Sequence, residues 1–310
     1  MKNIAIGADI GGSHITCAAI DLSSGKLLRD TLTERPVDNK ASADMIIGVW
    51  SEALSAVIKN VDGSQLKGIG FAMPGPFDYV KGISYIKGVA KYESLYGLNI
   101  TDAISSRLKV PDDFLIRFMN DASAFAVGEA WAGSASSVDR SLSITLGTGF
   151  GSAFIADRIP IVDGPLVPKI GCVYHLPYLN GIADDYFSTR GLLGRYKNLT
   201  GKQLSGVKEM ASLAGSDKEV LNLFIDFGDK LGEFLAPWLK GFGAEILVIG
   251  GNISHASNLF GSVLEERLKK ENVHCKVALS TLKEDAALLG SAYLLDDEFW
   301  KSIQHALPLM

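Results

Sequence analysis

The sequence predicts an α/β protein with two domains. Two segments read as an apolar strand, a glycine turn and a second apolar strand: residues 4–20 (IAIGADIGGSHITCAAI) and residues 141–156 (SLSITLGTGFGSAFIA). The chain therefore looks internally duplicated, and amphipathic stretches after each hairpin supply helices. With 310 residues, of which 47% are hydrophobic, the chain can bury a large core and divide it between two domains.

The first half begins with three expected strands, at residues 4–9, 15–21 and about 27–33, which form an antiparallel meander. Apolar residues recur at helical spacing between Ser42 and about Asn60, which predicts an amphipathic helix that covers the sheet. The remaining elements of this half follow in the order strand, helix, strand, helix, at residues 68–76, 96–110, 114–121 and 122–133.

The second half repeats this plan, with strands at residues 141–146 and 152–156. A loop-rich insertion at about 158–190 contains four prolines, and loops of this length are usually functional or locally ordered. A buried strand, AEILVIGG, and a small-residue helix, DAALLGSAYLL, follow it.

These elements suggest where the domains divide. We expect a small N-terminal domain over residues 1–118, joined by a C-terminal helix at about 295–310, and a larger domain over residues 119–294. No flexible linker is evident, so we place a short hinge near residues 117–121.

Composition excludes several classes of function. A formal net charge of −5 and the lack of a Lys- or Arg-rich run argue against a nucleic-acid partner. No 18-residue apolar run predicts a membrane span, and no signal peptide precedes the first strand. Three widely separated cysteines, Cys17, Cys172 and Cys275, fit a reduced cytoplasm better than a disulfide framework. We therefore expect a cytoplasmic protein.

The two glycine turns predict phosphate binding. Residues without a Cβ let backbone N–H groups approach phosphate oxygens closely and accept positive φ. The first turn carries Asp9, Gly11, Gly12 and Ser13, and the second carries Gly147, Thr148 and Gly149. Two such turns can bind one polyphosphate from opposite sides, so the sequence favours phosphoryl transfer. The alternative is an ordinary hairpin turn at each position.

Six motifs occur in the order seen in ROK-family sugar kinases, and the chain resembles that family over nearly its whole length. The motifs are DIGGS (9–13), GIGFAMPGP (68–76), NDASA (120–124), TLGTGFG (145–151), VIGGNIS (248–254) and ALLGSA (287–292). The resemblance implies a two-domain actin/hexokinase-like (ribonuclease H-like) α/β fold, with a mixed sheet in each domain and an interdomain cleft. It also implies ATP-dependent phosphorylation of a hexose or hexose derivative.

The same resemblance assigns the nucleotide site. Asp9 would orient Mg²⁺, through water, while the two glycine turns bind the phosphates of ATP. Gly250, Gly251 and Asn252 would lie at the adenosine end, where missing side chains make room for a flat ligand. A simple strand-to-helix turn is the alternative at that position.

For the sugar, the resemblance makes Asp121 the catalytic base that aligns and deprotonates the attacking hydroxyl. Asn120 would bind adjacent hydroxyls, and Pro74 and Gly75 would shape the wall beside the sugar. The alternative reading of Asp121 is that it only caps the following helix. Lys91, Tyr92 and Glu93 fall where related kinases bring sugar-contacting groups from the small domain.

The chain departs from the family in one segment. Typical members carry GExGH followed by CxCGxxGCxE, whereas this chain has PKIGCVYHLPYLNGIADDYFSTRG, with Lys169 in place of Glu and Cys172 in place of His. Cys172 and His175 alone give too few ligands for a structural zinc site, so we predict no zinc. GIADDYFS places Asp184 at the second sugar-binding acid, with Asp185 as a competitor.

Lys169 favours an anionic or modified sugar, unless it is simply solvated or the register has slipped. His175 is a substitute sugar ligand or a structural histidine.

Three functions remain open from the sequence. The leading one is a sugar kinase that uses ATP and Mg²⁺. A non-catalytic sugar or nucleotide sensor derived from a kinase is the second, because the GExGH and zinc segments are lost. A ROK-type transcriptional regulator is the third, but only MKNIAIG and one residue more precede Asp9, where a helix-turn-helix would be needed. The family commonly forms dimers, so a homodimer is one expected assembly.

Overall fold

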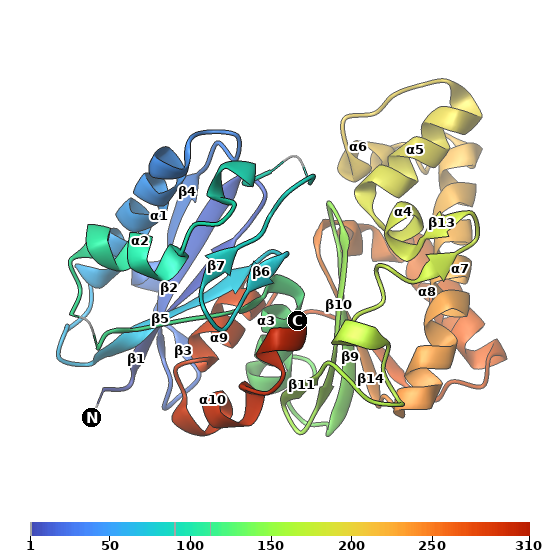
Figure 1. The fold of residues 1–310 in the computed structure, drawn as a ribbon. Helices are drawn as coiled ribbons and strands as arrows, with labels where there is room; N and C mark the ends of the chain where they lie inside the picture. The colour runs from blue at the N-terminus through green and yellow to red at the C-terminus, as the bar shows by residue number, and fades with distance from the viewer. Residues whose placement is uncertain (1, 90, 112) are drawn as a thin grey trace. The chain divides into compact units, whose positions relative to one another are not determined.

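The computed structural model describes residues 2–89, 91–111 and 113–310. Contacts between Cα atoms group the chain into two compact units, Met1–Gly133 with Glu284–Met310, and Ser134–Lys283. Each unit contains one mixed sheet with helices packed on it (Figure 1). The predicted α/β class, with a mixed sheet in each half, is confirmed.

The first unit is built on a six-stranded sheet. Its strands, in spatial order, are β3 (Lys26–Leu27), β2 (His14–Asp21), β1 (Ile4–Ile10), β5 (Leu66–Met73) and β8 (Leu115–Asn120), with β4 (Thr33–Pro36) also paired to β2. β1 runs antiparallel to β2 and parallel to β5, and β5 runs parallel to β8. The sheet therefore joins an antiparallel meander to a parallel half.

The expected third strand at about 27–33 is wrong as one element. It is split into β3, a short 3-10 helix (Arg29–Thr31) and β4. Thr31 explains the break, because its buried side chain enters the local hydrogen bonding. The Thr31 hydroxyl donates to the Leu28 carbonyl (2.6 Å) and accepts from the Ala19 N–H (2.8 Å), so it replaces a backbone partner of β2.

The helices of this unit follow the predicted order. They are α1 (Ala43–Ile58), α2 (Ile100–Leu108), α3 (Asp121–Ala132), α9 (Asp285–Tyr293) and α10 (Asp297–Ile303). Of these, α1, α3 and α9 pack on the sheet. Ser42 is the N-cap of α1, and its side chain accepts from the Met45 N–H. A short hairpin, β6 (Phe77–Asp78) with β7 (Ile83–Ser84), follows β5.

The second unit repeats the strand arrangement of the first. Its sheet has the order β11 (Ile159–Ile161), β10 (Phe150–Ala156), β9 (Arg140–Leu146), β14 (Ile246–Gly250) and β15 (Lys276–Leu279). β9 runs antiparallel to β10 and parallel to β14, and β14 runs parallel to β15. β9 and β10 thus correspond to β1 and β2, which confirms the internal duplication predicted from the two hairpins.

The insertion after β10 is ordered by short elements and by packing. It contains the hairpin of β12 (Pro177–Tyr178) and β13 (Gly181–Ile182) and the helix α4 (Ala183–Phe187). The helices α5 (Thr189–Thr200), α6 (Val207–Ser212), α7 (Lys218–Phe242) and α8 (Ser257–Lys270) complete the unit. Within the described ranges, no helix combines the length and the apolar character needed to cross a membrane.

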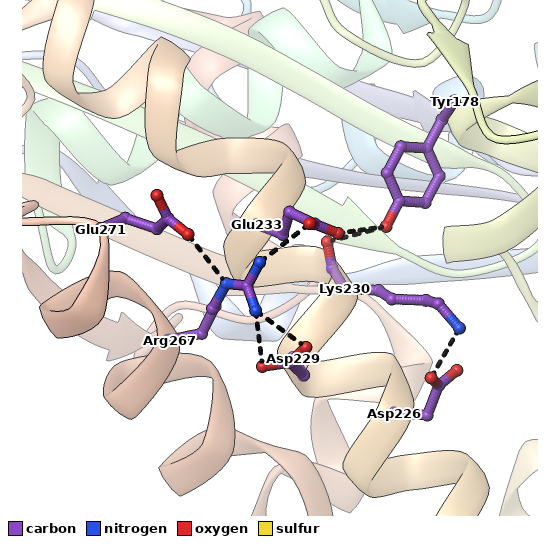
Figure 2. A network of polar contacts seen from close by, with 7 residues as sticks. All are labelled: Tyr178, Asp226, Asp229, Lys230, Glu233, Arg267 and Glu271. Atoms are coloured by element: carbon purple, nitrogen blue, oxygen red, sulfur yellow. Dashed lines mark hydrogen bonds and ion pairs between the residues drawn. The ribbon is translucent and has the colours of Figure 1, made fainter.

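A polar network anchors this insertion to α7 (Figure 2). Arg267 of α8 forms ion pairs with Asp229 (3.2 Å) and Glu233 (2.8 Å) of α7 and with Glu271 (3.0 Å). The Tyr178 hydroxyl of β12 donates to the Glu233 carboxylate (3.3 Å). Exposed ion pairs stabilise little singly, but Glu233 is shared, so one carboxylate connects α8, α7 and the hairpin.

The units divide at different places from those expected. The hinge was placed at 117–121 and the domain bounds at 118/119 and 294/295, but α3 and α9 both pack in the first unit. Gly128 of α3 and Gly290 of α9 allow this contact. A Cβ at Gly128 would lie 2.0 Å from the Ala286 carbonyl oxygen, and one at Gly290 would lie 1.8 Å from that of Ala124. This packing of α3 against α9 could not be predicted from the sequence, because the two helices are far apart along the chain.

This close approach gives a test of stability. Gly290→Ala is expected to lower the free energy of unfolding by about 3 kcal/mol, because a methyl group there overlaps the backbone of the neighbouring helix. Urea denaturation measures the effect. Gly63→Ala is the control, since its Cβ would meet no atom within 4 Å. Equal midpoints for the two variants would contradict the helix packing.

Candidate functional site

The predicted residues of the first unit meet at one edge of its sheet. In the register of the parallel strands, Asp9 of β1 is paired with Ala72 of β5, and Met73 of β5 with Asn120 of β8. Pro74 and Asp121 follow directly on the last two. Ligands of α/β sheets bind outside the carboxyl ends of the strands, which is where these residues lie.

The first glycine turn presents its carbonyls inward. All three carbonyl oxygens of Gly11, Gly12 and Ser13 accept hydrogen bonds from the same unit. The donors are the Tyr92 hydroxyl to Gly11 (2.6 Å), the Asn39 side-chain amide to Gly12 and the Val37 N–H to Ser13 (2.8 Å). In contrast, the N–H groups of Gly12 and Ser13 donate to no acceptor within the described residues. The turn therefore has two backbone donors free for an anion.

The second glycine turn has the same character. The Gly147 N–H donates to the Gly149 carbonyl (3.0 Å), and the Gly147 carbonyl accepts from the Thr189 N–H (2.8 Å). The N–H groups of Thr148 and Gly149 have no acceptor in the part of the chain that the structure describes. Each unit thus carries one turn with free amides, as the duplicated sequence predicts.

The glycines of these turns leave room beside the backbone, and they do not adopt a conformation that only glycine accepts. We expected positive φ, but Gly11, Gly12, Gly147 and Gly149 are not among the residues with positive φ. A Cβ at Gly12 or Gly147 would meet no protein atom within 4 Å. Packing within the protein therefore does not require glycine at Gly12 or Gly147. The lack of a side chain leaves the surface of each turn open to a ligand.

The junction of β8 and α3 separates two roles. Asn120 is the N-cap of α3, because its Oδ1 accepts from the Ala122 N–H (3.1 Å) and the Ser123 N–H (3.2 Å). The alternative that Asp121 is the cap is therefore wrong. The Asn120 amide nitrogen donates to Asp121 Oδ1 (3.0 Å), and a weaker contact reaches the Tyr79 hydroxyl (3.4 Å). Since these atoms are engaged, Asn120 orients Asp121 and has less capacity for sugar hydroxyls than expected.

Asp121 itself keeps one oxygen available. Its Oδ1 accepts from the Ala122 N–H (2.9 Å) and from Asn120, whereas Oδ2 has no hydrogen bond among the residues described. Asp121 is partly exposed at the sheet edge. A carboxylate fixed through one oxygen and open at the other is suited to accept a proton from a bound hydroxyl group.

Asp9 has an unusual electrostatic environment. Burial, the charge of Asp121 and the charge of Glu284, in that order, raise the pKa of Asp9 from 3.8 to about 7. Removing the carboxylate from water disfavours its charged form, and two further carboxylates add to the cost. A divalent cation would reverse this effect, because it favours the ionised form.

On the second unit, Asp184 supports the glycine turn. Its Oδ1 accepts from the Phe150 N–H (2.7 Å), directly after the turn, and its Oδ2 accepts from Arg190 (2.7 Å). The side chain is only 16% exposed. Asp184 was predicted to bind sugar, and in the structure both oxygens already have partners. Asp185, the competing candidate, accepts from the Ile182 N–H (3.1 Å).

Lys169, Cys172 and His175 lie close to one another in the segment that differs from the family pattern. The Cys172 thiol lies 3.7 Å from His175 Nδ1, and burial raises the pKa of Cys172 to about 12. The pKa of His175 is lowered, mainly by burial and also by the positive charge of Lys169. Lys169 is exposed. Within the described residues, no group of three or more His, Cys, Asp or Glu side chains could hold a metal ion.

The third glycine motif is structural at one position. Gly251 has a φ of 79°, and a Cβ there would lie 2.5 Å from the Leu146 carbonyl oxygen. Glycine is thus required by backbone conformation and packing, and not by room for a flat ligand. Gly250 is paired with Thr145 in the sheet, so Gly250, Gly251 and the exposed Asn252 follow the strand that neighbours the second turn.

Comparison with known proteins now decides the family. The family model of the ROK family matches residues 5–298 of the chain. The chain belongs to the ROK family. The resemblance predicted from the ordered motifs is confirmed for this ROK protein over nearly its whole length.

Individual relatives agree with this assignment. A glucokinase of Thermotoga maritima is 25% identical over 94% of this chain and 97% of its own length. An N-acetyl-D-glucosamine kinase of Pectobacterium atrosepticum is 26% identical over 84% of this chain and 88% of its own. The crystal structure of a ROK family glucokinase from Streptomyces griseus, in complex with glucose and AMPPNP, has a TM-score of 0.74 at 21% identity and covers 94% of this chain and 98% of that one. The predicted actin/hexokinase-like fold is confirmed.

Three residues of this ROK chain were not given their roles by sequence reasoning. Asn39 and Tyr92 hold the first glycine turn, although Tyr92 was expected to contact sugar, and Arg190 pairs with Asp184. Asn39 lies 27 residues from its turn and Tyr92 lies 81. No local sequence pattern predicts contacts over such separations, so these contacts became known only from the structure.

Proposed function

We propose that this ROK protein is an ATP-dependent kinase that phosphorylates a hydroxyl group of a hexose or hexose derivative. The observation that carries the proposal is the pair of glycine turns with free amides, together with the open oxygen of Asp121. The printed activities of the relatives, glucokinase and N-acetyl-D-glucosamine kinase, support the same reaction class.

The residues divide the work of phosphoryl transfer. The N–H groups of Gly12 and Ser13, and those of Thr148 and Gly149, bind phosphate oxygens. Asp121 accepts the proton of the attacking hydroxyl and holds that oxygen in line with the phosphorus. Asn120 keeps the Asp121 carboxylate in place. Phosphoryl transfer needs positioning more than covalent chemistry, so these contacts carry most of the catalysis.

Magnesium fits the carboxylates of the first unit. Asp9 has the oxygen donors that Mg²⁺ takes. Its raised pKa supports this proposal, because a nearby cation would favour the ionised carboxylate. Mg²⁺ commonly uses one or two carboxylates together with water and substrate phosphates, so a three-residue cluster is not required. When bound, Mg²⁺ would neutralise charge on the transferred phosphate. Asp9 is the residue that would hold it, through water.

The proposal is tested by sugar-dependent ADP release. Mg-ATP is offered with a panel of neutral hexoses, amino sugars, N-acetylated sugars and acidic sugars, because Lys169 and His175 leave the substrate class open. We expect release above the sugar-free rate for at least one member. Silence across the panel, with thermal stabilisation by sugar or nucleotide, would favour the non-catalytic sensor instead.

A substitution on the first turn separates binding from folding. Gly12→Ala is expected to weaken binding of Mg-AMPPNP about tenfold, because the added methyl group enters space that the protein leaves open at the proposed phosphate site. The unfolding temperature should stay within about 1 °C of the wild type, since the methyl group meets no protein atom. Titration calorimetry measures the affinity, with Gly63→Ala as the control. Unchanged affinity would remove the first turn from the nucleotide site.

A further inference from the structure

The two residues that hold the first glycine turn form one connected unit. Tyr92 donates its hydroxyl to the Gly11 carbonyl (2.6 Å), and Asn39 donates its side-chain amide to the Gly12 carbonyl. The backbone joins them as well, because the Tyr92 N–H donates to the Asn39 carbonyl (2.8 Å). The side chains of two residues whose backbones are hydrogen-bonded to one another thus hold two consecutive peptide groups of the turn.

Peptide geometry converts this fastening into an orientation of the free amides. A trans peptide group is planar, with its C=O and N–H pointing in opposite directions. The Gly11 carbonyl shares a peptide plane with the Gly12 N–H, and the Gly12 carbonyl shares one with the Ser13 N–H. When Tyr92 and Asn39 hold the carbonyls inward, the two N–H groups must point outward. Glycine would otherwise let these planes rotate freely.

Tyr92 is held in place at a conformational cost. Its φ of 55° and ψ of 20° lie in the left-handed region, which a bulky residue rarely adopts. Its side chain is fully buried, and its ring meets Trp50 of α1 edge-on, with centroids 5.6 Å apart. Strain of this kind persists only where the surroundings over-determine it, and it is concentrated at functional sites.

The Tyr92 hydroxyl remains a donor at physiological pH. Burial and the nearby charge of Asp9 raise its pKa above the ordinary tyrosine value, so it does not ionise. The Gly11 carbonyl that the hydroxyl binds lies two residues after Asp9, the carboxylate that we propose for Mg²⁺. Tyr92, Asn39, the glycine turn and Asp9 therefore belong to one local structure.

We propose that Tyr92 and Asn39 are positioning residues that aim the Gly12 and Ser13 amides at a nucleotide phosphate. The proposal rests on the proposed function in one respect, the identity of the anion as the polyphosphate of ATP. The second turn achieves a comparable orientation with the Thr189 N–H on the Gly147 carbonyl, a backbone donor. The first turn depends on side chains, so it can be tested by substitution.

The experiment compares Tyr92→Phe and Asn39→Ala with wild type. Tyr92→Phe keeps the ring against Trp50 and removes only the hydroxyl group. We expect each variant to bind Mg-AMPPNP about tenfold more weakly, the loss typical of one well-placed hydrogen bond. In turnover, the KM for ATP should rise in proportion, while the KM for the sugar should change less than about twofold, because the proposed function places the sugar at Asp121 and not at this turn.

A matched control is Tyr196→Phe, which removes another hydroxyl from a buried tyrosine, one that contacts Asp217 in the second unit (3.4 Å). It should leave nucleotide affinity unchanged. If Tyr92→Phe binds Mg-AMPPNP as wild type does, the positioning role is overturned while the kinase proposal stands. If Tyr92→Phe loses sugar affinity and thermal stability as much as nucleotide affinity, the hydroxyl is merely structural. Wild-type protein that binds no Mg-AMPPNP would overturn the kinase proposal and the positioning role together.

Discussion

Replacement of Asp121 by Asn is expected to lower kcat about 1,000-fold, within the range that a positioned general base contributes. Asn keeps the shape of the side chain and an oxygen that can accept from the Ala122 N–H, so α3 should be unaffected. It removes the charge and the proton acceptor. Sugar-dependent ADP release gives kcat, and calorimetry with Mg-AMPPNP should give an affinity within about threefold of wild type, because Asp121 has no assigned contact with the nucleotide.

The chain offers a matched control for this substitution. Asn99 caps α2 as Asn120 caps α3, and Asp102 lies in the first turn after that cap. Asp102→Asn therefore removes an acidic charge from a comparable helix start outside the site. It should leave kcat unchanged. If Asp121→Asn retained more than a tenth of the wild-type kcat, Asp121 would not be the base, and its role would reduce to supporting the helix start.

Local patterns predicted most of the fold. Each glycine hairpin is a short stretch in which strand, turn and strand are adjacent, so β1 with β2 and β9 with β10 could be read directly. The position of Asp121 at a strand-to-helix junction was equally local. The glycine turns were expected to present amides, and they do, although the expected positive φ was wrong because room above the turn matters instead.

Long-range contacts could not be predicted in the same way. The unit boundaries were misplaced because α3 and α9, which pack through Gly128 and Gly290, are far apart in sequence. Asp184 was given a sugar role from a motif, but its bond to the Phe150 N–H depends on how α4 lies against the second turn. The same holds for Tyr92. In each case the partner is chosen by tertiary packing, which a motif does not encode.

Asp9→Asn is expected to abolish turnover and at the same time to stabilise the protein in the absence of ligand. The pKa of Asp9 is raised from 3.8 to about 7, so the ionised carboxylate is unfavourable in the folded state. About three pKa units correspond to about 4 kcal/mol. Asp9 keeps some exposure to solvent, which screens its charge. We therefore expect about half of this value, a gain of about 2 kcal/mol in the free energy of unfolding at pH 8.

The pH dependence gives the sign. A carboxyl group whose folded pKa is raised costs nothing below pH 3.8, where it is protonated in both states. Its cost grows between pH 3.8 and about 7 and is complete above that, so the advantage of Asp9→Asn should be large at pH 8 and small at pH 4.5. Urea denaturation at the two pH values measures this.

Mg-ATP should then stabilise wild type at pH 8, because the cation offsets the negative charge of the ionised Asp9. It should have much less effect on Asp9→Asn, which lacks that charge. A variant less stable than wild type at pH 8 would show that the charge is already satisfied within the protein, and that Asp9 is no site for Mg²⁺. Stabilisation without loss of turnover would instead place the cation elsewhere. A functional carboxylate that lowers the stability of the free protein should show both effects when it is replaced: the apoprotein becomes more stable and turnover is lost.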